Sequence, residues 1–177
     1  MDDLELATAL KRKEPHALEV LVERHHGDLY RFMRHLTRRK EDAEDLTQQS
    51  LIRAYNKIGL FRGESSLKTW LHQVAFREFT TWRRRRMILV PLKLLRGAED
   101  PGYEQVDERE TFLGKLHALP AELREAVLLH YVQQLSIEQV AQVTGSPIGT
   151  VKSRLHHARK RLALSEAPTQ ENICYES

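Results

Sequence analysis

SIEQVAQVTGSPIGTVKSRLHHARKRL, residues 136–162, has the pattern of two short helices joined at a tight corner. Ser136 and the glutamine three residues later have the spacing of a capping box at a helix start. Gly145 suits the end of that helix, because glycine tolerates a positive φ. Ser146 is expected to cap the second helix, with Pro147 at its first position, where a missing N–H costs nothing.

Apolar residues recur at helical spacing along both segments, and basic or small polar side chains lie between them. The expected inward stripes are Ile137, Val140, Ala141 and Val143, then Ile148, Val151, Leu155, Ala158 and Leu162; the expected outward residues are Thr150, Lys152, Ser153, Arg154 and His157. A basic outward face on the second helix fits the DNA major groove, since Lys and Arg meet phosphates and guanine edges. DNA binding is therefore predicted, with an ordinary helical hairpin as the alternative.

The charges of the chain are segregated, although the net charge is only +3. Basic clusters lie at Arg31–Lys40, Arg83–Arg86 and Lys152–Arg161, and acidic ones at Asp2–Glu5 and Glu99–Glu110. Such segregation suits a protein that touches polyanions with some faces and protein partners with others.

One cysteine, Cys174, stands near a polar C-terminus, so no disulfide within the chain is possible. This fits a reducing cytoplasm. An inert tail cysteine is favoured over a thiol switch. The acidic start is not expected to act as a signal peptide, and no window approaches the roughly 18–20 apolar residues of a membrane span. A cytoplasmic protein is predicted.

Strand signals are nearly absent, and the one β-like run, Ile88–Leu95, is interrupted by Pro91 and Lys93. The predicted fold is all-α, with two small helical domains joined by an acidic flexible linker, the C-terminal one carrying the helix–turn–helix. The expected boundaries are a first domain at 1–88, a linker at 89–108, a second domain at 109–165 and a disordered tail at 166–177.

Aromatic and cationic residues alternate in LKTWLHQVAFREFTTWRRRR, residues 67–86. The expected inward stripe includes Trp70 and Trp82, with Phe76 and Phe79 nearer its edges, and His72 is grouped with the cations. Such a segment can stack unpaired bases and hold the backbone of a separated strand. The alternative is that the aromatic rings are core and the arginines are a solvated helix end.

Three blocks in this order resemble the extracytoplasmic function group of the sigma-70 family of bacterial sigma factors. The blocks are DAEDLTQQSLIRAY, then FRGESSLKTWLHQVA, then LPAELREAVLLHYVQQLSIEQVAQVTGSPIGTVKSRLHHARKRL. The resemblance covers about Pro15 to Leu164. It implies a subunit without enzymatic activity that binds RNA polymerase core through its β′ and β subunits, reads promoter DNA, and is controlled by an anti-sigma factor.

The resemblance also implies the roles of particular residues. The polymerase-docking helix would use Asp42, Asp45, Leu46, Gln48, Gln49, Arg53 and Ala54. The −10 element would be captured and read by Phe61, Arg62, Gly63, Glu64, Ser65, Ser66, Lys68, Thr69, Trp70, Gln73 and Arg77. The −35 element would be read by Ser146, Pro147, Gly149, Thr150, Lys152, Ser153, Arg154 and His157. The acidic linker resembles the segment that threads toward the RNA exit path.

Two positions depart from the family pattern. Gln49 stands where a glutamate is frequent, which removes one charge from the expected polymerase contact. Arg77 stands where an asparagine is frequent, which puts base-specific reading at that position in doubt.

No residue set points to catalysis, a small-molecule substrate, a cofactor or a metal. The pairs His25–His26 and His156–His157 are adjacent, so helix geometry directs their side chains apart. Two other classes stay open, namely a dimeric operator-binding regulator and a recombinase. The first would need a dimerising or ligand-sensing domain, and the second would need a nucleophilic serine in an α/β domain. A sigma factor, monomeric when free, should bind duplex DNA poorly without polymerase.

Overall fold

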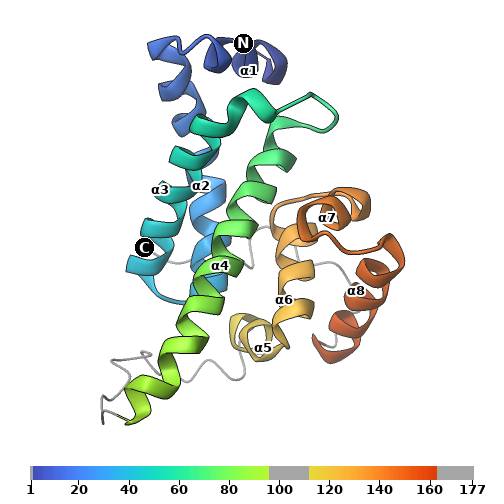
Figure 1. Ribbon diagram of the computed structural model, residues 1–177. Coiled ribbons are helices and arrows are strands. Elements are labelled where there is room, and N and C mark those ends of the chain that lie inside the picture. Colours follow the sequence, from blue (N-terminus) through green and yellow to red (C-terminus); the bar gives the residue numbers. More distant parts are fainter. Residues whose placement is uncertain (1, 96–111, 163–177) are drawn as a thin grey trace. The chain divides into compact units, whose positions relative to one another are not determined.

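The computed structural model describes residues 2–95, with side chains up to residue 87, and residues 112–162. All regular structure in these ranges is helical, which confirms the predicted all-α class. Residues 2–95 belong to one compact unit and residues 112–162 to another. The elements are α1 (Asp3–Lys11), α2 (Pro15–Thr37), α3 (Lys40–Lys57), the 3₁₀ turn η1 (Ile58–Leu60), α4 (Leu67–Leu95), α5 (Phe112–Ala118), α6 (Ala121–Val127), the π-helical turn η2 (Leu128–Val132), α7 (Ile137–Thr144) and α8 (Ile148–Leu162) (Figure 1).

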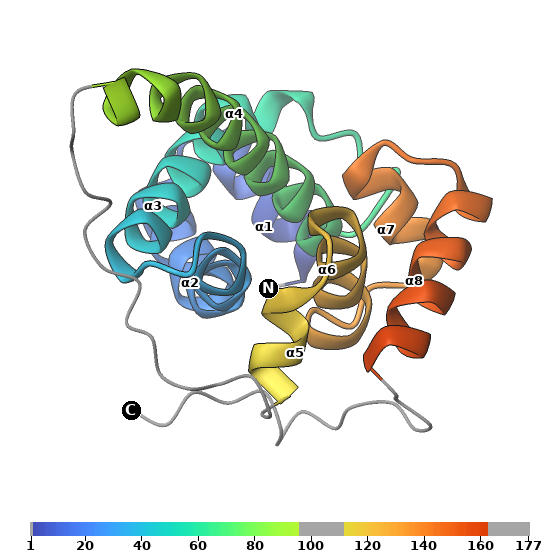
Figure 2. The same ribbon diagram turned by 90° about the horizontal axis from the view of Figure 1, so that it is seen from below.

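The N-terminal unit is built on the long stripe of α2. α3 packs along α2, and α4 packs along α3; Figure 2 shows α2 nearly end-on beside α3. The stripe places Leu21, Leu29, Phe32 and Met33 in the core, each almost fully buried. Burying side chains of this size is worth about 1.5–3 kcal/mol each, so this seam contributes substantially to the stability of the unit.

Helix α4 is longer than the sequence predicted. It continues through Leu95, so the expected β-like run Ile88–Leu95 is wrong and residues 89–95 of the expected linker are helical. Proline lacks one N–H and clashes with the preceding turn, but its fixed φ is helical, so a helix can pass through Pro91 at the cost of a kink or a lost hydrogen bond. Residues 96–111 and 163–177, which include most of the expected linker, the tail and Cys174, lie outside the described residues.

The aromatic side chains of α4 are arranged differently from the prediction. Phe76 and Phe79 are buried, whereas Trp70 and Trp82 are only half-buried. His72 is buried as well, with its Nδ1 donating to the Lys68 carbonyl at 2.8 Å. It is therefore a core residue and not one of the outward cations.

In the C-terminal unit, α8 packs against α6 and α7. Its core contains Leu116, Leu128, Val140, Val151 and Leu155, all buried, as the spacing predicted for α7 and α8. Ile148 was also expected to face inward but is 43% exposed. It stands in the first turn of α8, at the edge of the unit.

The corner between α7 and α8 confirms most of the predicted capping. The Ser136 hydroxyl accepts from the N–H of the glutamine three residues on at 3.2 Å, and that side chain accepts from the Ser136 N–H at 2.8 Å. Gly145 ends α7 with φ +66°. α8 begins at Ile148, one residue later than predicted, and the Pro147 carbonyl accepts its first helical hydrogen bond. The Ser146 hydroxyl accepts from an arginine instead.

Candidate nucleic-acid interface

The connection between α3 and α4 presents a short exposed segment between two fixed ends. We call residues 61–66 the α3–α4 loop. Phe61 is buried and its ring lies 5.6 Å from that of Trp70. Arg62, Gly63 and Glu64 are exposed, and Gly63 has φ +77°, a conformation that side chains with a Cβ rarely adopt.

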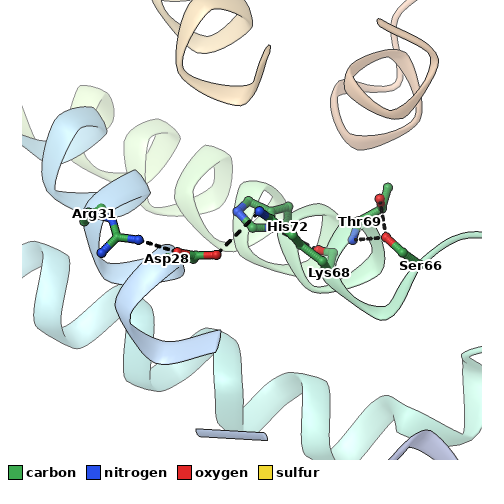
Figure 3. A network of polar contacts seen from close by, with 6 residues as sticks. All are labelled: Asp28, Arg31, Ser66, Lys68, Thr69 and His72. Carbon is green, nitrogen blue, oxygen red and sulfur yellow. Dashed lines mark hydrogen bonds and ion pairs between the residues drawn. The ribbon is translucent and has the colours of Figure 1, made fainter. Parts of the chain in front are cut away.

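The far end of the loop is held by a cap on α4. The Ser66 hydroxyl accepts from the Thr69 N–H at 3.1 Å and shares a hydrogen bond of 2.8 Å with the Thr69 hydroxyl (Figure 3). Ser66 thus caps the helix. Thr69 itself is fully buried, so this member of the expected −10 set supports the cap from inside.

Charged groups of α2 and α4 meet next to the loop. Asp28 forms ion pairs with Arg31 and, at 3.5 Å, with Lys68 (Figure 3). Further along α4, Gln73 is half-buried and Arg77 is exposed. Gln73 and Arg77 are four residues apart and lie on one side of α4, whereas Lys68, nine residues before Arg77, lies on the opposite side beside the loop.

The four arginines at residues 83–86 serve two purposes. The Arg83 guanidinium lies 5.2 Å from the Phe79 ring, and the Arg86 guanidinium lies 5.2 Å from the Trp82 ring. Arg84 and Arg85 are exposed. Two arginines therefore cover aromatic rings by cation–π contact, and two point to solvent, where they can meet phosphates.

The polar side of α3 divides into a paired part and an open part. Asp42 forms an ion pair with Arg86 at 2.9 Å, and Arg53 forms one with Glu78 at 2.9 Å. These pairs join α3 to α4 and show that the two helices run in opposite directions. Leu46, expected at the polymerase contact, is in the core.

The open part of α3 consists of Asp45, Gln48, Gln49 and Ile52, all exposed. Their spacing places them on one helical face. Ile52 is 55% exposed, which makes it an apolar residue at the centre of a polar face. The sequence analysis did not select Ile52. Its spacing would have indicated it, because Ile52 follows Gln49 by three residues and Gln48 by four, which places all three on one helical face.

The outward face of α8 is basic. Lys152, Ser153 and His157 are exposed as predicted, and so is Gly149. Pro147 is also exposed, whereas Ser146 and Thr150 are half-buried. The helical spacing adds two exposed residues that were not predicted, His156 and Lys160, and both lie nearer the centre of this face than His157.

Arg154 differs from its expected outward position. Only 20% of its side chain is exposed, and its guanidinium donates to the Ser146 hydroxyl at 2.9 Å and to the Glu122 carboxylate at 3.1 Å. It therefore ties α8 to the corner and to α6.

Glu138, on α7, accepts hydrogen bonds from its own backbone N–H and from the Ser136 hydroxyl. These bonds lower the pKa of the Glu138 carboxyl.

Two histidines of α2 are buried, which disfavours their charged forms. Burial lowers the pKa of His25, although the negative charges of Asp3 and Asp28 act to raise it. Burial, with help from Arg34 and Arg31, lowers the pKa of His35 to about 4. Within residues 2–95 and 112–162, no group of three or more His, Cys, Asp or Glu side chains is placed to hold a metal ion.

Family models match both units. The model of Sigma-70 region 2 matches residues 21–87, and that of Sigma-70 region 4 matches residues 109–162. The ECF RNA polymerase sigma factor SigM of Mycobacterium tuberculosis is 34% identical over 164 residues, which cover 91% of this chain and 83% of SigM. The chain belongs to the ECF sigma factors.

Two further relatives agree with this membership. SigE of Mycolicibacterium smegmatis is 35% identical over 151 residues, covering 80% of this ECF sigma factor and 58% of SigE. The solved structure of RpoE from Bartonella quintana, in complex with the anti-sigma factor NepR, has a TM-score of 0.67 and 31% identity, covering 81% of this chain and 92% of that one.

The matched segments contain the surfaces described above. The region 2 match includes the open part of α3, the α3–α4 loop and α4 to residue 87, and the region 4 match includes the basic face of α8. α1 precedes the first match. In the described parts of the chain, no helix has the length and apolar character needed to cross a membrane.

Proposed function

We propose that this ECF sigma factor binds RNA polymerase core and directs promoter-specific initiation, with one DNA contact on each unit. The observation that carries the proposal is the presence of a basic helix–turn–helix face in one unit and a capped, exposed loop beside exposed cations in the other. Each surface is small, and affinity driven by phosphates alone would give little specificity. Polymerase would fix their spacing, so that two weak contacts act together.

The polymerase contact in this proposal is the open part of α3, defined by Asp45, Gln48, Gln49 and Ile52. An exposed apolar residue surrounded by polar ones is typical of the centre of a protein interface. Asp42 and Arg53 would contribute indirectly, because their ion pairs with α4 hold the helix in place.

The −10 contact would be the α3–α4 loop together with α4. Loop residues 62–65, of which Arg62, Gly63 and Glu64 are exposed, would accept an unpaired base. Gln73 and Arg77 would contact the separated strand along α4, and Lys68 would contact it beside the loop. Arg84 and Arg85 would add phosphate contacts. Trapping an unpaired base would make opening of the duplex favourable without any catalytic group, so the protein would not be an enzyme.

The −35 contact would be the face of α8 with Gly149, Lys152, Ser153, His156 and Lys160 in the major groove. The first turn of a recognition helix meets base edges in helix–turn–helix proteins, and the last turn meets phosphates. Arg159 and Arg161, which are exposed, extend the basic end of the helix.

Regulation by an anti-sigma factor is part of the proposal. It is supported by the likeness to RpoE, which was solved in complex with the anti-sigma factor NepR. Working with polymerase and promoter DNA places the protein in the cytoplasm, and we propose that it is a monomer when free. No small-molecule substrate is needed for this activity.

The proposal is tested by core binding and by DNA binding in the absence of polymerase. Asp45→Arg should abolish capture of core polymerase in a pull-down, because it reverses the charge in the open part of α3. Glu23→Arg, an equal charge change at an exposed position of α2, should not. Unchanged capture by Asp45→Arg would remove this face from the proposal. Tight binding of the unaltered protein to duplex genomic fragments without polymerase would favour a dimeric operator-binding regulator instead.

A further inference from the structure

The first helix and the residues after it are bonded to the α3–α4 loop across a long stretch of sequence. The Asp3 carboxylate accepts from the Leu67 N–H at 3.2 Å, 64 residues away. The Lys11 ammonium donates to the Phe61 carbonyl at 2.8 Å, 50 residues away. α1 and the connection between α3 and α4 lie at the same end of the N-terminal unit (Figure 1).

These two bonds fix the two ends of the loop. The Leu67 N–H is the first amide of α4, one of the groups that a helix leaves without an internal partner. A carboxylate is a favourable acceptor there, because the helix dipole attracts negative charge to its N-terminus. The Phe61 carbonyl is the entry to the loop, so Lys11 holds the other end.

A third contact secures the end of α3. The Lys13 ammonium donates to the Tyr55 carbonyl at 3.2 Å and lies 3.7 Å from the centre of the Tyr55 ring. A cation at the last carbonyls of a helix is favoured by the same dipole. The chain that leads into η1 and the loop is therefore held as well.

α1 is itself firmly anchored, which lets it act as a support. Leu6 and Leu10 are fully buried. A capping box between Asp2 and Glu5 closes its N-terminus, with bonds of 2.7 and 2.8 Å. A loop bonded to such a helix is restrained at both of its ends.

We propose that α1 is a brace that holds the α3–α4 loop in the shape that accepts an unpaired promoter base, with Asp3 and Lys11 as its positioning residues. This rests on the proposed function of the loop. The brace lies outside the region 2 match, which begins at residue 21. Its advantage is preorganisation: a loop already ordered does not lose that freedom when it binds DNA, so affinity and opening rate both gain.

The first arm of the test measures the loop itself by amide hydrogen exchange in the full chain. Lys11→Met should raise exchange of amides in residues 61–67 at least tenfold, while the amides of α2 keep their protection. Arg12→Met is the matched control, because Arg12 carries the same charge on the next residue and its side chain is 71% exposed. Lys11→Arg should restore protection, since it returns a cationic donor to the Phe61 carbonyl.

The second arm measures promoter opening by the polymerase holoenzyme on a duplex fragment that the unaltered protein transcribes. Lys11→Met and Asp3→Ala should each slow open-complex formation at least fivefold, with affinity for core polymerase unchanged. A fragment whose −10 region is already unpaired should recover only part of this loss, because the loosened loop still binds the base poorly.

Several results would overturn the brace. One is loop exchange in Lys11→Met equal to that of Arg12→Met. Another is a looser loop with an unchanged opening rate, and a third is loss of protection throughout α2 and α3, which would mean that α1 serves overall stability only. If the unaltered protein transcribes no fragment, the proposed function has failed. Faster loop exchange in Lys11→Met would then still show that α1 holds the loop.

Discussion

Arg154→Ala is predicted to loosen the C-terminal unit and not merely to remove a DNA contact. The arginine donates to the half-buried Ser146 hydroxyl at 2.9 Å and to Glu122 at 3.1 Å. The first bond should contribute about 1 kcal/mol. The second contributes a few tenths, because the Glu122 side chain is 69% exposed and solvent screens the pair. The expected loss in free energy of unfolding is roughly 1–2 kcal/mol.

Amide hydrogen exchange of α6, α7 and α8 is the assay for this loss. A destabilisation of that size should raise exchange there by a factor of about 5–30. Tryptophan fluorescence provides an internal control, since both tryptophans, Trp70 and Trp82, lie in the N-terminal unit and should report no change. Arg159→Ala removes the same charge from an exposed position of α8 and should leave exchange unaltered.

A double-mutant cycle with Ser146→Ala separates the bond from other effects of the substitution. The two changes should be non-additive by about 1 kcal/mol, since either one breaks the same hydrogen bond. If Arg154→Ala instead matches Arg159→Ala in exchange while −35 binding falls, the reasoning is refuted and Arg154 is a direct reader of DNA.

Three further outcomes follow from single residues. Ile52→Asp should weaken core polymerase binding by at least tenfold with an unchanged melting temperature, because the side chain is exposed and stands in the open part of α3; equal affinity would exclude it from the contact. Burial lowers the pKa of His35 to about 4 in the folded chain, so as pH falls the unfolded chain takes up this proton before the folded chain does. The free energy of unfolding should therefore fall as pH drops from about 6.5 toward 4. His35→Phe should reduce that loss in acid-denaturation curves, whereas His16→Gln, at an exposed site, should not. Gly145→Ala should cost about 1 kcal/mol because φ is +66°, whereas Gly149→Ala should be neutral or stabilising, because the position of the added Cβ is open. Urea curves in which both variants lose stability equally would contradict this.

The corner of the helix–turn–helix could be predicted because its signals are local. The capping box at Ser136 and the positive φ at Gly145 depend on residues within four positions, and the structure contains both. The buried stripe of α8 followed in the same way from spacing. The position of Arg154 could not be predicted, because Glu122, one of its two partners, is 32 residues away in the chain.

The N-terminal unit shows the same boundary between local and distant causes. The helices were visible in the sequence, but the division of the polar side of α3 was not. Asp42 and Arg53 look like their neighbours in sequence, and only the packing of α4 against α3 pairs them with Arg86 and Glu78. Likewise, nothing near Asp3 indicates that its partner is the first amide of α4.

Run-off transcription tests the central claim most directly. Purified core polymerase is incubated with pooled genomic promoter fragments, with and without the protein. Discrete transcripts that depend on the protein are the predicted result, and they would identify its promoters at the same time. The absence of transcripts, together with tight binding of the protein to duplex DNA without polymerase, would contradict the assignment of these surfaces to a sigma factor's promoter contacts.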